Sequence, residues 1–235
     1  MHKLNRAAVQ RPACLDNYDW NTQTWDKLHG QNKKRVRLSL QSMQGQQIVD
    51  DASDDEQYFI VGLRCAYCEG QIYYGGHIEH FRRKNPAHYP ALTFEWTNLF
   101  IACGSKEHCG HYKDRPSAPP YAPDNLIKPD EHVPDDYLYF HTSGEVRVRH
   151  RPGMTDNDRR RGAETIRVFN LNCGRLRGDR QKAVNLYLSR SKRILEDLME
   201  FEENDRQAFI DEEIEATKWE PFWTTIRHSF EKLHA

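Results

Sequence analysis

The chain has 235 residues, of which 37% are apolar and 29% are charged, and its formal net charge is −1. No stretch approaches the roughly 18 apolar residues of a membrane-spanning helix, and the N-terminal segment lacks the apolar core of a signal peptide. We therefore expect a cytoplasmic protein with no membrane partner. In that reducing compartment the six cysteines predict metal ligands or buried thiols rather than disulfides, and the isolated Cys14 and Cys173 are interpreted as buried thiols.

The N-terminal quarter is expected to be largely helical. After an irregular beginning, a helix is predicted from near Trp25 to about Met43. Gly45 and the acidic run 50–56 indicate a loop. The apolar segment 58–63 then leads into the first cysteine pair, and it is too short to be assigned to a helix or a strand.

Two cysteine pairs bracket the next segment. Cys65 and Cys68 form a Cys-x-x-Cys knuckle, and Cys103 and Cys109 follow after a gap long enough for a hairpin. Two such pairs are typical of one tetrahedral structural zinc ion, with redox dithiols or unconnected buried thiols as the alternative. Because the spacer between Cys103 and Cys109 is longer than the usual spacing of roughly two to four residues, His108 is an alternative fourth ligand.

Residues suited to catalysis lie between the cysteine pairs. Glu79 offers hard oxygen ligands for Mg²⁺, and the adjacent His80, whose side chain ordinarily titrates near pH ~6.5, can accept a proton from water. Asn98 can tie two backbone segments together or assist a metal ion, and His111 completes the set. Each residue alone is weak evidence, so their order between two thiol pairs carries the interpretation.

The C-terminal half combines a loop, a hairpin and helices. Six prolines between residues 115 and 134 favour an extended loop, and residues 137–149 predict a β-hairpin that turns at Gly144. Asp156 or Asp158 is predicted to cap a helix that runs to about Asn170, and a second helix is predicted to begin at Asp179. Its expected buried residues are Ala183, Leu186, Leu188, Ile194, Leu195 and Leu198. One or two further helices are expected to bury Phe209, Ile214, Trp219, Phe222, Trp223, Ile226 and Phe230.

Charge is unevenly distributed along this half. Residues 158–195 carry eleven Lys or Arg against three Asp or Glu, whereas residues 196–235 carry four against twelve. The basic block predicts a face that contacts nucleic acid or a partner, with Arg175, Arg177 and Arg180 as candidates. The alternative is that the basic block and the acidic tail are solvated helix faces that pair with each other.

The central motifs resemble those of a known family. Glu79-His80, then Asn98, then His111 with Lys113 two positions on, resemble the signature positions of HNH nucleases, whose ββα-metal fold surrounds one divalent ion. The resemblance extends to the HNH endonucleases of retron and Septu anti-phage systems, the PtuB group. It rests on Leu4-Asn5-Arg6 with Pro12 and Leu15, Cys65-Ala66-Tyr67-Cys68-Glu69, His77-Ile78-Glu79-His80-Phe81, Trp96-Thr97-Asn98-Leu99 and Leu171-Asn172-Cys173. The sequence departs from the family pattern in two places. Glu79 stands at the first signature position, where Asp is commoner, and the loop from Cys103 to His111 is expanded, which leaves either His108 or His111 as the metal ligand.

The resemblance implies an α+β fold in which a zinc-stapled ββα core is flanked by helical regions. The implied segments are an N-terminal helical region (1–60), the nuclease core (61–118), a proline-rich loop with a hairpin (119–154) and a C-terminal helical region (155–235). In the implied Mg²⁺-dependent endonuclease, His80 is the general base, Glu79 and His111 bind Mg²⁺, and Asn98 orients a loop or ligates the metal. Candidates to bind the substrate are Arg82, Arg83, Lys84 and Lys113.

The resemblance also implies partners. These are a nucleic acid substrate, either DNA or RNA such as tRNA, a PtuA-type ABC/SMC-like ATPase, and in retron systems a reverse transcriptase with its RNA–DNA product. The aromatic residues Trp219, Phe222 and Trp223 are either a docking surface or simple core. Two other functions fit the residue types: a zinc-stapled binding module without catalysis, and a zinc hydrolase that uses His77, His80 and His111.

Overall fold

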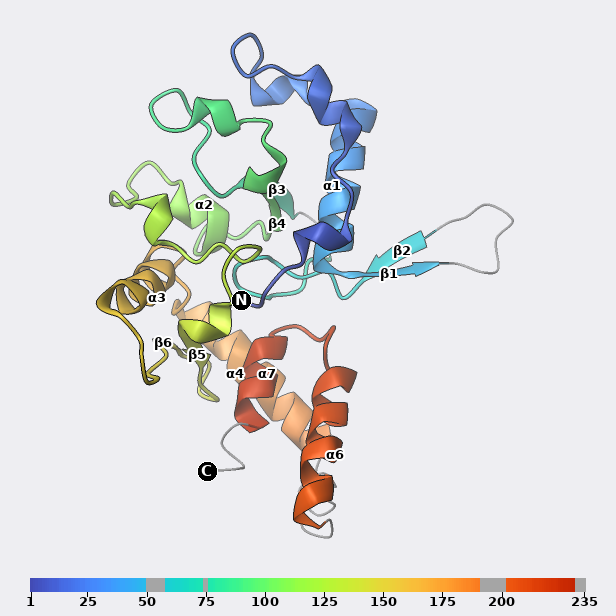
Figure 1. Cartoon of the computed structure of the whole chain (residues 1–235), viewed down its shortest axis with the longest axis vertical. Helices are drawn as coiled ribbons and strands as arrows, with labels where there is room; N and C mark the ends of the chain where they lie inside the picture. The colour runs from blue at the N-terminus through green and yellow to red at the C-terminus, as the bar shows by residue number, and fades with distance from the viewer. Residues whose placement is uncertain (50–57, 74–75, 191–201, 231–235) are drawn as a thin grey trace.

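The computed structural model describes residues 1–49, 58–73, 76–190 and 202–230. Within these ranges, helices combine with three two-stranded antiparallel sheets (Figure 1), so the prediction of an α+β fold is confirmed. None of the described helices is both long and apolar enough to cross a membrane.

Each sheet is a pair of short strands joined in antiparallel register. The pairs are β1 (Gln46–Val49) with β2 (Tyr58–Val61), β3 (His77–His80) with β4 (Leu99–Ala102), and β5 (Leu138–Phe140) with β6 (Val146–Val148). In the last pair Phe140 lies opposite Val146, and Gly144 adopts a φ of 79° in the turn, as the predicted hairpin requires. Between Gly45 and the acidic run, residues 46–49 form a strand that the sequence did not predict, and they pair with the β-branched and aromatic residues of β2. The acidic run 50–56, predicted as a loop, lies outside the described residues.

The described helices are α1 (Gly30–Gln44), α2 (Cys109–Lys113), α3 (Asp156–Val168), α4 (Gly174–Arg190), α6 (Glu203–Ala216) and α7 (Trp223–Phe230). Short 3-10 turns occupy Arg6–Ala8, Ala13–Asn17, Trp25–Lys27, Pro90–Leu92, Trp96–Asn98, Pro123–Asn125 and Pro134–Asp136. The first predicted helix therefore starts later than expected, because Trp25 begins only a single turn. Helices α4, α6 and α7 lie at the end of the molecule opposite α1 (Figure 1).

The cap of one helix and the start of another differ from the prediction. Helix α3 is capped by Thr155, whose hydroxyl accepts from the Asp158 amide at 3.1 Å while the Asp158 carboxylate accepts from the Thr155 amide at 2.9 Å. This reciprocal pair satisfies two amides that the helix itself leaves free. Helix α4 begins at Gly174, five residues before the predicted Asp179.

Helix α4 also buries a different face from the predicted one. Val184 is buried against α7, with Tyr187 beside it at helical spacing. Leu186 and Leu188 lie outside that stripe and are 51% and 39% exposed, so their predicted burial is wrong. The predicted buried positions at 194, 195 and 198 fall outside the described residues.

Arg180 on the same helix corrects the predicted basic face. Its side chain is fully buried, and its Nη1 donates to the carbonyls of Leu171 at 2.6 Å and Gly144 at 3.1 Å. A guanidinium in that position holds the β5–β6 turn to the chain before α4 and cannot meet a partner in solvent. Arg175 and Arg177 remain exposed.

One hydrophobic core includes residues from all four predicted segments. Leu4, Ile101, Phe140 and Leu171 all belong to it and are at most 2% exposed. The four segments therefore share one core. Cys14 is buried in this core and Cys173 packs at its edge. A second, smaller cluster joins α4, α6 and α7 through Val184, Ile210, Ile226 and Phe230.

The C-terminal aromatic residues pack inwards. Phe222 is 8% exposed, and the Trp223 indole donates to the Ile214 carbonyl at 3.1 Å. The Arg64 guanidinium lies 5.8 Å from the Trp219 ring and 5.9 Å from the Trp223 ring. Phe222 therefore belongs to the core, as the second of the two interpretations has it, whereas Trp219 and Trp223 are half-buried at its edge.

Candidate metal and catalytic site

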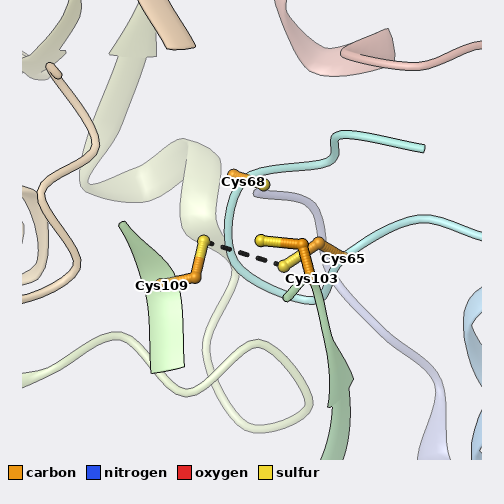
Figure 2. A group of neighbouring side chains, drawn as sticks. All are labelled: Cys65, Cys68, Cys103 and Cys109. Atoms are coloured by element: carbon orange, nitrogen blue, oxygen red, sulfur yellow. Dashed lines mark hydrogen bonds between the residues drawn. The ribbon is translucent and has the colours of Figure 1, made fainter. Parts of the chain in front are cut away.

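Four cysteine sulfurs converge on one point in the structure. The sulfurs of Cys65, Cys68, Cys103 and Cys109 all lie within 4.8 Å of one another, and Figure 2 shows them facing one another from three separate segments. The Cys65 and Cys109 sulfurs are 3.7 Å apart, close to the ~3.8 Å edge of a tetrahedron with Zn–S bonds of ~2.3 Å and far from a disulfide bond. The four cysteines thus form a group that could hold a metal ion such as zinc.

Backbone contacts hold the three segments together. In the knuckle, the Ala66 amide donates to the Ile101 carbonyl of β4 at 3.1 Å, and Cys103 follows directly after that strand. Cys109 begins helix α2 with a φ of 61°, a left-handed conformation that is uncommon for a residue with a side chain. Its amide donates to the Phe169 carbonyl at 2.9 Å. Packing from strand, knuckle and α3 therefore fixes the direction of the fourth sulfur.

The protonation of the thiols favours a bound cation. Hydrogen bonds from the neighbouring thiols hold the pKa of Cys103 well below its usual range. Burial, followed by hydrogen bonds from the same neighbours, raises the pKa of Cys109, and a hydrogen bond with Cys103 is the main cause of the raised pKa of Cys68. The Cys103 thiolate is thus stabilised, while Cys68 and Cys109 resist ionisation. A divalent cation at the centre would remove that conflict, because zinc binds thiolates.

His108 lies beside the cysteines without replacing one of them. Its side chain is buried, with Nδ1 3.2 Å from the Cys109 sulfur and 3.6 Å from the Cys103 sulfur. The convergent group contains Cys109 and not His108, so Cys109 is the better candidate for the fourth ligand. An imidazole N–H at these distances can donate to the sulfurs and stabilise their charge.

Beside this cluster, strands β3 and β4 and helix α2 surround Glu79. The Glu79 carboxylate is buried, with Oε1 3.0 Å from the Lys113 ammonium and Oε2 3.0 Å from His77 Nε2. Burial raises the pKa of Glu79, but Lys113 and His77 lower it more, to about 2. A Cβ at Gly110 would lie 2.3 Å from Oε2, so the carboxylate packs directly on the backbone of α2.

His111 reaches this carboxylate region and His108 does not. The exposed His111 ring stacks on His77, with ring centroids 4.1 Å apart and planes 16° from parallel. Burial, then the neighbouring His77, lowers the pKa of His111, which favours the neutral form that binds metals. The structure therefore places His108 with the cysteines and His111 with Glu79.

His80 points to the opposite side of β3 from Glu79, as alternate residues of a strand do. Its Nε2 lies 2.9 Å from the Thr93 carbonyl, and the Trp25 ring meets it edge-on with centroids 4.4 Å apart. Burial, followed by the charge of Lys84, lowers the pKa of His80 to about 4. The ring is neutral at pH 7, and donation from Nε2 to the carbonyl leaves Nδ1 as the proton acceptor.

Asn98 has the loop-orienting role. Its amide nitrogen donates to the carbonyls of Arg82 at 3.0 Å and Leu92 at 3.1 Å, and its carbonyl accepts from the Arg82 amide at 2.8 Å. Asn98 thus closes the loop that follows β3, which is the loop that carries Thr93. Of the two roles predicted from the sequence, the geometry supports backbone positioning.

The four candidate substrate-binding cations divide into two groups. Lys113 is fully buried, with its ammonium 2.7 Å from Asp114 and 3.0 Å from Glu79. The prediction that it grips a phosphate is wrong, because the ammonium neutralises the buried Glu79 carboxylate and that of Asp114 at the surface. Arg82 pairs with Asp124, and Arg83 pairs with Asp114 at 2.8 Å. Both arginines are partly exposed, and Lys84 is half-buried with no ion pair among the described residues.

The predicted three-histidine zinc site does not form, because His80 leaves β3 on the face opposite His77. In the described part of the chain, the cysteines are the one group of three or more closely converging metal ligands. Sequence reasoning gave Trp25 and Thr93 no role beside His80. Their contacts depend on loops far apart in the sequence, so no local pattern indicates them.

The chain matches no protein-family model, and no curated protein is significantly similar to it.

Proposed function

We propose that the chain is a divalent-metal-dependent endonuclease of the HNH type. The observation that carries the proposal is the placement of Glu79 and His80 as adjacent residues at the end of β3, with His111 of α2 stacked on His77, the histidine that contacts the Glu79 carboxylate. Strands β3 and β4 with α2 form a ββα unit, and the cysteine group joins their ends. A simple zinc-stapled binding module has no need of this pair of acid and base.

The residues around Glu79 fit a catalytic divalent cation. His77 Nδ1 is buried without a hydrogen-bond partner, while Glu79 Oε1 lies 3.0 Å from the Lys113 ammonium. The Glu79 carboxylate packs on the backbone at Gly110, where a side chain would not fit. Glu79 and His111 would hold the ion. When bound, it would supply charge to polarise the phosphate and stabilise the leaving oxygen.

In the proposed reaction, His80 acts as the base. Its Nδ1 takes a proton from water, the water oxygen forms a bond to phosphorus, and the P–O bond to the leaving sugar oxygen breaks, with that oxygen protonated from solvent. The Thr93 carbonyl holds the ring in the required tautomer. Asn98 holds the loop that carries this carbonyl, and Lys84, with Arg82 and Arg83 at the same loop, is available to contact phosphates.

The biological setting of the proposal rests on the resemblance to the PtuB group. We propose that the endonuclease is an effector of anti-phage defence in the cytoplasm, together with a PtuA-type ABC/SMC-like ATPase and, in a retron setting, a reverse transcriptase with its RNA–DNA product. DNA and RNA, including tRNA, are both candidate substrates.

Zinc-loaded protein incubated with plasmid DNA, single-stranded DNA and total RNA tests the proposal. Reactions contain Mg²⁺ or Mn²⁺, with and without the ATPase, and the product ends are sequenced. We expect His80→Ala to abolish cleavage, because a general base typically contributes ~10²–10⁴-fold. His150→Ala, at an exposed histidine after β6, is the matched control and should cleave normally.

Two results would contradict the proposal. Equal cleavage by His80→Ala would remove the assigned base. Binding of nucleic acid without cleavage by wild-type protein, with every ion and with the ATPase, would favour the zinc-stapled binding module. Zinc content and unfolding midpoints of both variants show whether each has kept its fold.

A further inference from the structure

Arg180 of helix α4 carries a positive charge inside the protein. Its side chain is fully buried, yet no Asp or Glu in the described part of the chain forms an ion pair with it. Nη1 donates to two backbone carbonyls, whereas Nε and Nη2 are buried and make no hydrogen bond. Burying a charge is costly unless an opposite charge lies close to it. An anion other than a paired carboxylate is therefore expected near Arg180.

The buried carboxylate of Glu69 is engaged by other residues. Among carboxylates, Glu69 has the largest effect on the pKa of Arg180. Its Oε1 accepts from the Thr224 hydroxyl at 2.6 Å and lies 2.7 Å from His2 Nδ1, and its Oε2 accepts from the Thr224 amide at 3.2 Å. Glu69 thus joins the N-terminal segment to α7 and leaves the Arg180 charge without a direct partner.

The cysteine group lies beside this part of α4. Leu176 precedes Arg180 by one helical turn on the same face of the helix, and Leu176 lines the same cavity as Cys68 and Cys103. Burial lowers the pKa of Arg180, and an ionised Cys68 is the largest of the charges that oppose this fall. The thiols are therefore the nearest source of negative charge for the guanidinium.

The backbone also connects Arg180 to the cysteine group. The Leu171 carbonyl accepts from Arg180 at 2.6 Å. Two residues earlier, the Phe169 carbonyl accepts from the Cys109 amide at 2.9 Å. The segment between α3 and α4 therefore holds the guanidinium and the fourth sulfur on one short stretch of chain, so the position of Arg180 relative to the sulfurs is fixed.

We propose that the Arg180 guanidinium is the internal counter-ion of the metal-loaded cysteine group, and that its charge sets how tightly the group holds zinc. Four thiolates around one Zn²⁺ ion leave an excess of two negative charges. Cys65, Cys68 and Cys109 are at most 1% exposed, so solvent screens this excess poorly and a fixed cation nearby stabilises it strongly. The inference concerns the cysteine group and does not depend on the nuclease assignment.

Variants at position 180 separate the charge of the side chain from its hydrogen bonds. Arg180→Lys keeps the charge and an N–H donor, whereas Arg180→Gln keeps a donor and removes the charge. Arg180→Met is a second neutral variant, because an apolar side chain of similar length is often tolerated where a buried amide is not. If Arg180 only holds the two carbonyls, the Lys and Gln variants should behave alike.

Competition with a chromogenic zinc chelator at pH 7 measures the zinc affinity of each variant. We expect Arg180→Gln and Arg180→Met to bind zinc about tenfold to a hundredfold more weakly than the wild type, the range typical for loss of an outer partner of a metal site. Arg180→Lys should stay much closer to the wild type. Co²⁺-loaded variants should all keep the charge-transfer absorption of four-thiolate coordination, which shows that no ligand has been lost.

Two control variants on the same helix complete the experiment. Arg175→Met removes a cation whose side chain is 70% exposed, and its zinc affinity should be unchanged because solvent screens that charge. Val184→Ala weakens the buried packing of α4 without changing any charge. Because zinc binding is coupled to folding, this variant shows how far a less stable fold by itself lowers the zinc affinity.

The inference is overturned if the Lys and Gln variants lose zinc affinity equally, or if Arg180→Met, folded, binds zinc as the wild type does. It is also overturned if Val184→Ala, at the same unfolding midpoint as a neutral variant, loses as much affinity. A wild-type protein that binds no zinc would overturn it as well, whatever the protein cleaves. Weaker binding in both neutral variants, with recovery in Arg180→Lys, would support it.

Discussion

Replacing Glu79 by Gln isolates the buried charge at the centre of the candidate site. The substitution keeps the shape of the side chain and removes its negative charge, so the Lys113 ammonium keeps Asp114, at 2.7 Å, as its remaining carboxylate partner. Lys113 is fully buried, and a buried charge that loses a partner is strongly destabilising. We therefore expect Glu79→Gln to lower the free energy of unfolding substantially.

The size of the effect follows from the pKa of Glu79. Its fall from 4.5 to about 2 corresponds to about 3 kcal/mol, at about 1.4 kcal/mol per pKa unit. Because the folded-state value lies below the unfolded one, this contribution is complete above pH 4.5 and is lost as the pH falls towards 2. At pH 7 the whole contribution is present, so Glu79→Gln should cost about 3 kcal/mol there.

Urea unfolding at pH 7 with excess zinc measures this change. Glu164→Gln is the control, because Glu164 forms a partly exposed ion pair with Arg167 and should change stability by less than about 1 kcal/mol. The double variant Glu79→Gln/Lys113→Met should cost less than the two single variants added together, with a coupling of about 1–3 kcal/mol. A Glu79→Gln protein within about 0.5 kcal/mol of wild type would refute the reasoning.

Three further predictions concern other parts of the molecule. Cys65→Ser should lower the zinc content from about one ion per chain and lower the unfolding midpoint; a wild-type protein that is stable without zinc would contradict this. Cleavage should decline as the pH falls through about 4, which is the pKa of His80; a decline centred near pH ~6.5, the ordinary value for histidine, would show that this histidine is not buried as described. Arg180→Ala should destabilise the fold by about 2–4 kcal/mol, since it leaves a cavity and two carbonyls without a donor, whereas exposed Arg175→Glu should cost less than about 0.5 kcal/mol. Equal costs of the two substitutions would contradict the burial of Arg180.

Local features of the sequence predicted the elements that depend on neighbouring residues. The alternating residues around Gly144 predicted the β5–β6 hairpin, because strand alternation and turn conformation are properties of a few adjacent residues. The two thiol pairs predicted the cysteine group, since two cysteine pairs with this spacing are typical of four sulfurs arranged as a tetrahedron around one zinc ion. The order of Glu79, His80 and His111 predicted the candidate catalytic residues, because that order is a property of the sequence alone.

Tertiary packing decided which of these side chains are buried and which point into the cysteine group. Nothing local distinguishes Cys109 from His108 as a ligand, and the choice follows from β4, the knuckle and α3 directing the Cys109 sulfur inwards. The sequence predicted Lys113 and Arg180 as cations that contact a substrate or a partner, yet both side chains are fully buried. The sequence determines where charges and thiols occur along the chain. Only the tertiary structure determines which of them are buried from solvent, because burial depends on contacts with segments that are distant in the sequence.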